Sequence, residues 1–229
     1  MKETSVPIPI GSQQAYARLA GFMYFVVLVF DIAGLVIASI VSGQVSFLET
    51  SQRIASSETL YRLGLCAGLV GSLATIPLAV GLYVAVRPVD SNLAIMALLF
   101  RTSEAAIGAT AVGLSFTAMQ IHLAANQANA FTTNQLGALA GLSSGVPTEI
   151  PAIFFSVGST LFFYLLLKSR YIPPLVSSWG IFASVLYAVA WLVSLTLPHY
   201  AGAVVAISSV PILLAEVSTG LWLLTRGLR

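Results

Sequence analysis

Residues 19–41 read LAGFMYFVVLVFDIAGLVIASIV, an apolar run that contains a single charged residue, Asp31. A helix needs about 20 apolar residues to cross the hydrocarbon core of a bilayer. The apolar cores of signal peptides are shorter, at about 7–15 residues. We therefore interpret this segment as a retained membrane span and not as a cleavable signal peptide.

Five further apolar segments follow along the chain. The six predicted spans are residues 17–41, 60–86, 93–121, 146–167, 175–197 and 203–225. Such runs form helices in lipid because a helix satisfies its backbone polar groups internally, which a lone strand cannot do. The predicted fold class is all-α, a polytopic integral membrane protein with six transmembrane helices in a compact bundle. Residues 1–15 are predicted to be a flexible cytoplasmic tail, and residues 16–229 a single six-helix transmembrane domain.

The composition excludes most soluble classes of protein. Of the 229 residues, 58% are hydrophobic and 8% are charged, with a net charge of +2, whereas soluble domains average about 25% charged residues. A water-soluble enzyme, a nucleic-acid binder and a disordered chain are therefore poor fits. Cys66 is the only cysteine, which rules out an internal disulfide and a cysteine-rich metal site. We expect membrane lipids as partners and no cofactor, and the sequence leaves a homo-oligomer open.

The basic residues predict the orientation. With six spans, one side of the membrane receives Lys2, Arg18, Arg87, Lys168, Arg170, Arg226 and Arg229. The opposite side receives Arg53 and Arg62. Because basic residues are enriched on the cytoplasmic side of membrane proteins, both termini are predicted to lie in the cytoplasm. The predicted location is the bacterial inner membrane.

Several ionisable residues fall where lipid makes them costly. Asp31, Arg101, Glu104 and Glu216 lie well inside predicted spans, and Arg62 and Glu149 lie in first turns. A charge at the centre of a bilayer costs about 2.5–3.5 kcal/mol on insertion scales. Arg101 and Glu104 are three residues apart, so their side chains share one helix face. We expect Asp31, Arg62, Arg101, Glu104 and Glu216 to converge on one interior site that binds a small solute or carries a proton.

Two other interpretations stay open. In the first, the protein is a non-transporting membrane scaffold or sensor, and its intramembrane ion pairs hold the helices together. In the second, it is an intramembrane hydrolase, because residues 141–145, GLSSG, match the G-x-S-x-G pattern around Ser143. That motif normally follows a strand, and none precedes it here. We therefore predict no catalytic residue and no metal site, with His122, Glu149 and His199 as secondary candidates for the interior site.

Several short segments together resemble a known family. They are ARLAG at 17–21 with Tyr24, YRLG at 61–64, LY at 82–83, RPV at 87–89, LFR at 99–101, EAA at 104–106, FF at 154–155, YL at 164–165, KSRYIP at 168–173 and WG at 179–180. The pattern is similar to that of bacterial six-span membrane proteins catalogued as a domain of unknown function (number 4386). It covers most of residues 17–191.

The resemblance also shows departures from the family pattern. The family typically has a basic residue where this chain has Pro174, and often an aromatic-glycine step where it has Ser156. The resemblance implies the six-span topology and draws attention to Arg18, Arg62, Arg101 and Glu104. It implies no substrate and no activity.

Overall fold

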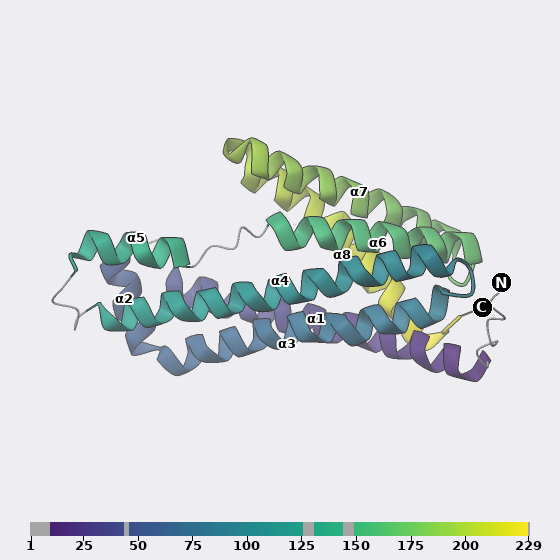
Figure 1. The fold of residues 1–229 in the computed structure, drawn as a ribbon, viewed down its shortest axis with the longest axis horizontal. Coiled ribbons are helices and arrows are strands. Elements are labelled where there is room, and N and C mark those ends of the chain that lie inside the picture. The colour runs from purple at the N-terminus through teal and green to yellow at the C-terminus, as the bar shows by residue number, and fades with distance from the viewer. Residues whose placement is uncertain (1–9, 44–45, 126–130, 144–148, 229) are drawn as a thin grey trace. The chain divides into compact units, whose positions relative to one another are not determined.

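The computed structural model describes residues 10–43, 46–125, 131–143 and 149–228, and every regular element in these ranges is a helix. Six of the helices are long and apolar enough to cross a membrane. They are α1 (Ile10–Ser42), α3 (Glu58–Val86), α4 (Ser91–Ala124), α6 (Glu149–Ser169), α7 (Pro174–Thr196) and α8 (Ala201–Thr225) (Figure 1). The prediction of an all-helical protein with six spans is confirmed. The predicted start of the fourth span, residue 146, lies outside the described residues.

Three shorter elements lie between the spans: α2 (Phe47–Ser56), α5 (Thr133–Ser143) and the 3₁₀ helix η1 (Pro198–Tyr200). The sequence analysis missed α2. Its N-cap is Ser46, whose side chain accepts a hydrogen bond from the backbone N–H of Glu49 at 3.3 Å. A serine three residues before a glutamate is a known signature of a helix start, so the signal for α2 was present in the sequence.

Helix α1 begins earlier than predicted. Residues 10–15, assigned above to the flexible tail, belong to α1. Two glutamines anchor this turn: Gln13 Nε2 donates to the backbone carbonyl of Ala85 at 2.7 Å, and Gln14 Oε1 accepts from the backbone N–H of Leu228 at 2.8 Å. Polar side chains therefore extend the helix beyond its apolar part. Residues 1–9 lie outside the described part of the chain.

Tight turns connect α3 to α4 and α6 to α7. Between α3 and α4, Asp90 Oδ1 accepts from the backbone N–H of Leu93 at 3.1 Å and so caps the start of α4. Between α6 and α7, Arg170 takes a positive φ of 57°. Helix α7 then begins with Pro174 in its first turn, where a missing N–H has no cost.

The contacts divide the chain into two compact units. Unit 1 contains Met1–Phe25, Thr75–Thr102 and Ala152–Arg229, and unit 2 contains Val26–Ala74 and Ser103–Pro151. Helices α1, α3 and α4 each contribute residues to both units. The single transmembrane domain expected from the sequence stays a prediction, and each unit is described by itself.

In unit 1, glycines bring helices close together. A Cβ atom on Gly21 of α1 would lie 2.8 Å from the carbonyl oxygen of Gly220 and 2.9 Å from the carbonyl carbon of Leu223, both in α8. In the same unit, a Cβ on Gly180 of α7 would overlap the ring of Phe163 of α6. The start of α1 and the end of α8 lie at the same end of this unit (Figure 1).

In unit 2, an apolar cluster joins four helices. Val41 of α1, Ile54 of α2 and Met119 of α4 are buried together. Tyr61 and Leu65 of α3 pack against them. Helix α2, though short, is therefore held by burial of one face against the longer helices.

A substitution at Gly21 tests the close approach of α1 and α8. Gly21→Ala places a methyl group against the backbone of α8, which cannot rotate away, so we expect a loss of about 1–3 kcal/mol in stability. Thermal unfolding in detergent measures the change. Gly11→Ala is the control on the same helix, because a Cβ there meets nothing within 4 Å. A melting temperature of Gly21→Ala equal to or above that of the wild type would contradict the packing.

Candidate functional site

Arg101 is the largest fully buried side chain in the described structure, with 2% of its surface exposed. It lies on α4 within unit 1. Its Nη1 donates to the hydroxyl of Ser159 on α6 at 3.4 Å, and its guanidinium carbon lies 4.5 Å from the centre of the Phe155 ring. A guanidinium over an aromatic face gains energy that grows as water is removed. Helix α6 thus contributes both a hydroxyl and an aromatic face to a buried charge.

Gly158 makes room for the stem of Arg101. A Cβ atom at this position would lie 2.8 Å from Arg101 Cγ and 3.0 Å from its Cδ. Serine, glycine and phenylalanine on one face of α6 therefore form the seat of the arginine. The contacts continue to α7, where Tyr187 meets the Phe155 ring edge-on at 5.6 Å.

In unit 2, α1 approaches α3 closely along a glycine face of α3. A Cβ atom on Gly34 of α1 would lie 3.1 Å from the carbonyl oxygen of Gly64 and 3.1 Å from the backbone nitrogen of Gly68. One turn further along, a Cβ on Gly71 would overlap the carboxylate of Asp31. Glycines four residues apart commonly let membrane helices approach this closely.

A pocket of about 270 Å³ opens beside these glycines. Its walls come from α1, α3 and α4, and its lining residues are Asp31, Gly34, Leu35, Ala38, Tyr61, Gly64, Leu65, Gly68 and Val112. Asp31 is the only acidic residue in this lining, and no basic residue belongs to it. We name this space the Asp31 pocket.

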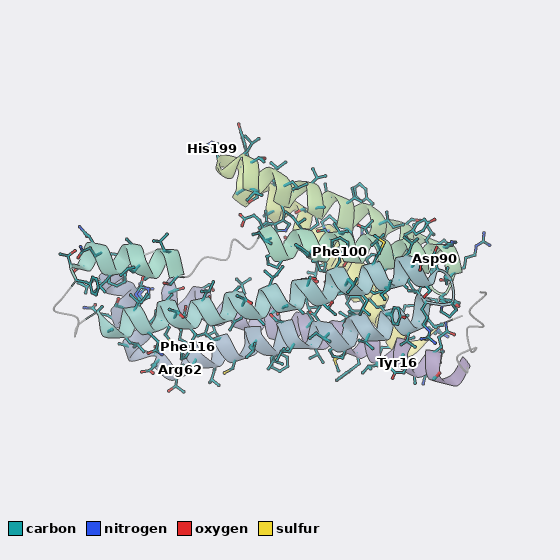
Figure 2. All side chains as sticks on the ribbon, in the orientation of Figure 1. Tyr16, Arg62, Asp90, Phe100, Phe116 and His199 are labelled. Carbon is teal, nitrogen blue, oxygen red and sulfur yellow. The ribbon has the colours of Figure 1, made fainter. Side chains whose placement is uncertain are left out.

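Arg62 lines a second hollow in unit 2, which shares Leu65 and Val112 with the Asp31 pocket. It forms an ion pair with Glu58, one turn earlier on α3, with Nη2 2.7 Å from Glu58 Oε1. Its guanidinium carbon also lies 5.4 Å from the centre of the Phe116 ring of α4 (Figure 2). Arg62 is therefore paired with an acidic residue on its own helix.

The other predicted site residues are divided between the two units. Glu216 lies half-buried on α8 in unit 1, together with Arg101, whereas Glu104 lies half-buried on α4 in unit 2, together with Asp31 and Arg62. Within unit 2, Asp31 and Arg62 line different hollows. The convergence of all five side chains on one site stays a prediction.

His122, a secondary candidate, is engaged by α2. The hydroxyl of Ser51 donates to the carbonyl of Phe47 at 2.8 Å, and Ser51 Oγ lies 2.9 Å from His122 Nδ1. When the hydroxyl proton goes to the Phe47 carbonyl, Nδ1 carries the proton of the second bond and donates it to Ser51. The Phe47 ring stacks on the imidazole at 4.7 Å. This arrangement holds α2 against α4 and does not prepare Ser51 as a nucleophile, which would have to give its proton to the histidine.

The remaining secondary candidates lie at helix ends. Glu149 is the first residue of α6, where a carboxylate is favoured by the helix dipole. His199 lies in η1 and meets the Tyr200 ring edge-on at 5.2 Å. Ser143 is the last residue of α5, and residues 144–145 of its motif lie outside the described residues. Within the described ranges, no three His, Cys, Asp or Glu side chains gather to hold a metal ion.

The sequence analysis missed two features of these sites. The first is the glycine face of α3, although residues 64–68, GLCAG, carry the G-x-x-x-G spacing. The second is Glu58 as the partner of Arg62, although an acid four residues before a base is the usual spacing of a helical ion pair. Both features could have been predicted, because each depends on residues only four positions apart in the sequence.

The fold and these sites define a multi-pass helical membrane protein with ionisable side chains inside its spans. Residues 19–227 match the family described as "Domain of unknown function (DUF4386)", and the chain belongs to this family. The resemblance inferred from the sequence is therefore confirmed. None of the curated proteins and none of the solved structures matches the chain.

A double-mutant cycle tests the seat of Arg101. Phe155→Leu removes the aromatic face, and we expect a coupling of about 1–2 kcal/mol with Arg101→Met, the range for a desolvated cation–π contact. Unfolding of each purified variant in detergent gives the four stabilities. Phe22→Leu is the control, because Phe22 is 51% exposed on α1, and its effect should stay within about 0.5 kcal/mol. Strictly additive costs for Phe155 and Arg101 would show that the two side chains do not interact.

Proposed function

We propose that this integral membrane protein uses the Asp31 pocket to bind a small cationic solute or a proton. The observation that carries the proposal is an acidic residue of a membrane span in the lining of a pocket of about 270 Å³ between α1, α3 and α4. A carboxylate within hydrocarbon is stabilised by contact with a cation or by taking up a proton. Ionisable residues inside membrane spans commonly mark the paths of ions and substrates.

The depth of Asp31 supports this proposal. Asp31 lies 11 residues before the end of α1 at Ser42, which corresponds to about 16 Å along the helix. The hydrocarbon core of a bilayer is about 30 Å thick, so this distance fits a position inside it. A charged carboxylate at that depth costs free energy, which favours a functional role for Asp31.

The volume limits what the pocket can hold. Sites for drug-sized ligands are typically about 300–1,000 Å³, and the Asp31 pocket, at about 270 Å³, falls below that range. At about 30 Å³ per water molecule, it has room for a hydrated monovalent cation, a short chain of waters or a small amine. Gly34, Gly64 and Gly68 create this room, because they place no side chain in it.

The orientation and location belong to the same proposal. We propose that both termini lie in the cytoplasm and that the membrane is the bacterial inner membrane. Support comes from the excess of basic residues at one set of span ends. The hydrogen bonds of Gln13 and Gln14 add to it, because they join the start of α1 to the ends of α3 and α8, as alternating spans require.

A second candidate function is a non-transporting scaffold or sensor. It is favoured by the burial of Arg101, of whose side chain only 2% is exposed. Within unit 1, the guanidinium of Arg101 contacts Ser159 and Phe155 of α6. A buried charge with such contacts supports a role in helix packing. The two candidates make different predictions for Asp31. A cation-binding protein responds to cations through this carboxylate, whereas a scaffold does not respond to cations.

Asp31→Asn separates the two candidates. We expect Na⁺, K⁺ or methylammonium to raise the melting temperature of the wild-type protein in detergent, by about 1.4 kcal/mol of stabilisation at ten times the Kd. That gain corresponds to about 3–5 °C for a chain of this size. The rise in melting temperature caused by the cation should become smaller as the pH is lowered, because a protonated carboxyl cannot pair with a cation. Asp31→Asn should abolish both responses.

Two further variants make this experiment specific. Gly68→Ala keeps the carboxylate but places a methyl group in the pocket, at an ordinary contact distance of 3.5 Å from Val112, and should weaken the cation response. Glu49→Gln removes an exposed carboxylate on α2 that pairs with Arg53, and should leave the response intact. A scaffold would show no cation response in the wild type, and a response that survives Asp31→Asn would also refute the proposal.

A further inference from the structure

The hollow beside Arg62 is a groove along two helices. On α3 its lining residues are 62, 65, 66 and 69, and on α4 they are 109, 112, 113 and 116. Both sets follow the spacing i, i+3, i+4, i+7, which is one face of a helix over two turns. The groove is therefore about 10 Å long, and its volume is about 390 Å³.

The groove has an apolar body and one charged end. Leu65, Leu69 and Val112 line the body, together with small residues that leave it open. The two helices run in opposite directions here, because Arg62, the first residue of one set, contacts Phe116, the last residue of the other (Figure 2). Arg62 lies four residues after the start of α3, or about 6 Å from the helix end. The charged end thus fits the headgroup region of a bilayer and the apolar body fits the hydrocarbon below it.

The charged end carries both signs. Arg62 Nε and Nη2 both donate to the same oxygen, Glu58 Oε1, at 2.8 and 2.7 Å. A guanidinium has five N–H donors and a carboxylate has two oxygens, so this ion pair leaves hydrogen-bonding capacity on both side chains. Both side chains are 41% exposed. A ligand at this end therefore meets a cation and an anion side by side.

We propose that the groove between α3 and α4 binds a phospholipid with a phosphoethanolamine headgroup, one acyl chain lying along Leu65, Leu69 and Val112. The phosphate accepts hydrogen bonds from Arg62, and the primary ammonium donates to Glu58. Charge complementarity selects this headgroup: an anionic phosphatidylglycerol would meet the Glu58 carboxylate, and the trimethylammonium of phosphatidylcholine has no N–H to donate. This site is separate from the Asp31 pocket, and its test does not depend on the function proposed above.

Lipid retention provides the first test. The full chain is purified in detergent with equal amounts of palmitoyl-oleoyl phosphatidylethanolamine, phosphatidylglycerol and phosphatidylcholine, and native mass spectrometry counts the bound lipid. We expect the wild type to retain phosphatidylethanolamine about threefold over each of the others, in line with the modest strength of exposed charge pairs. Glu58→Gln should remove this preference, and Arg62→Gln should lower retention of all three. Equal or better retention of phosphatidylglycerol by the wild type, or an unchanged preference in Glu58→Gln, would overturn the proposal.

Filling the groove is the second test. A Cβ on Gly113 meets nothing within 4 Å, so Gly113→Leu places a side chain into the groove without a clash at its base and should abolish the selective retention. Gly202→Leu is the matched control on α8, where a Cβ also meets nothing within 4 Å. Retention that is unchanged in Gly113→Leu would place the lipid elsewhere and overturn the site.

The single cysteine reports on the groove directly. Cys66 is exposed and belongs to the groove lining, and it is the only thiol in the chain. Added phosphatidylethanolamine should slow maleimide labelling of Cys66 in the wild type, more than the same amount of phosphatidylglycerol does, and should have no such effect in Gly113→Leu. Labelling that does not respond to phosphatidylethanolamine in the wild type would contradict occupation of the groove.

Discussion

Contact between helix backbones at glycine is the interaction on which both units depend. Within lipid, helices gain little from the hydrophobic effect when they associate, because the surrounding acyl chains are as apolar as the side chains. Close packing and polar contacts must hold them instead. Gly21 brings α1 against α8 in unit 1, and Gly34 brings α1 against α3 in unit 2. One helix therefore uses two glycines to make its contacts in both units.

The same residues that permit close packing also create the two charged sites. Gly158 leaves space for the stem of Arg101, so that its guanidinium reaches Ser159 and Phe155. In unit 2, Gly64 and Gly68 keep the Asp31 pocket open. The two charges nevertheless have different surroundings. Arg101 is enclosed by packed side chains, whereas Asp31 belongs to the lining of a pocket.

The sequence predicted the spans well because length and apolarity alone determine them. It predicted poorly wherever a few polar atoms decide the outcome. Residues 10–15 look like a tail, yet the amides of Gln13 and Gln14 extend α1 through partners far away in the chain. The ion pair of Arg62 with Glu58, one turn away on α3, was likewise not predicted. The spacing of Glu58 and Arg62 was visible in the sequence. The hydrogen bonds of Gln13 and Gln14 could be predicted only by knowing which helix ends meet.

The two hollows of unit 2 share a wall, and this links their occupants. Leu65 and Val112 line both the Asp31 pocket and the groove beside Arg62. A rotamer change at either side chain enlarges one space at the expense of the other, because packed interiors leave little spare volume. If a cation and a lipid occupy these spaces as proposed, any effect of lipid on cation affinity equals the effect of cation on lipid affinity. Leu65 and Val112 are the residues through which such an effect would act.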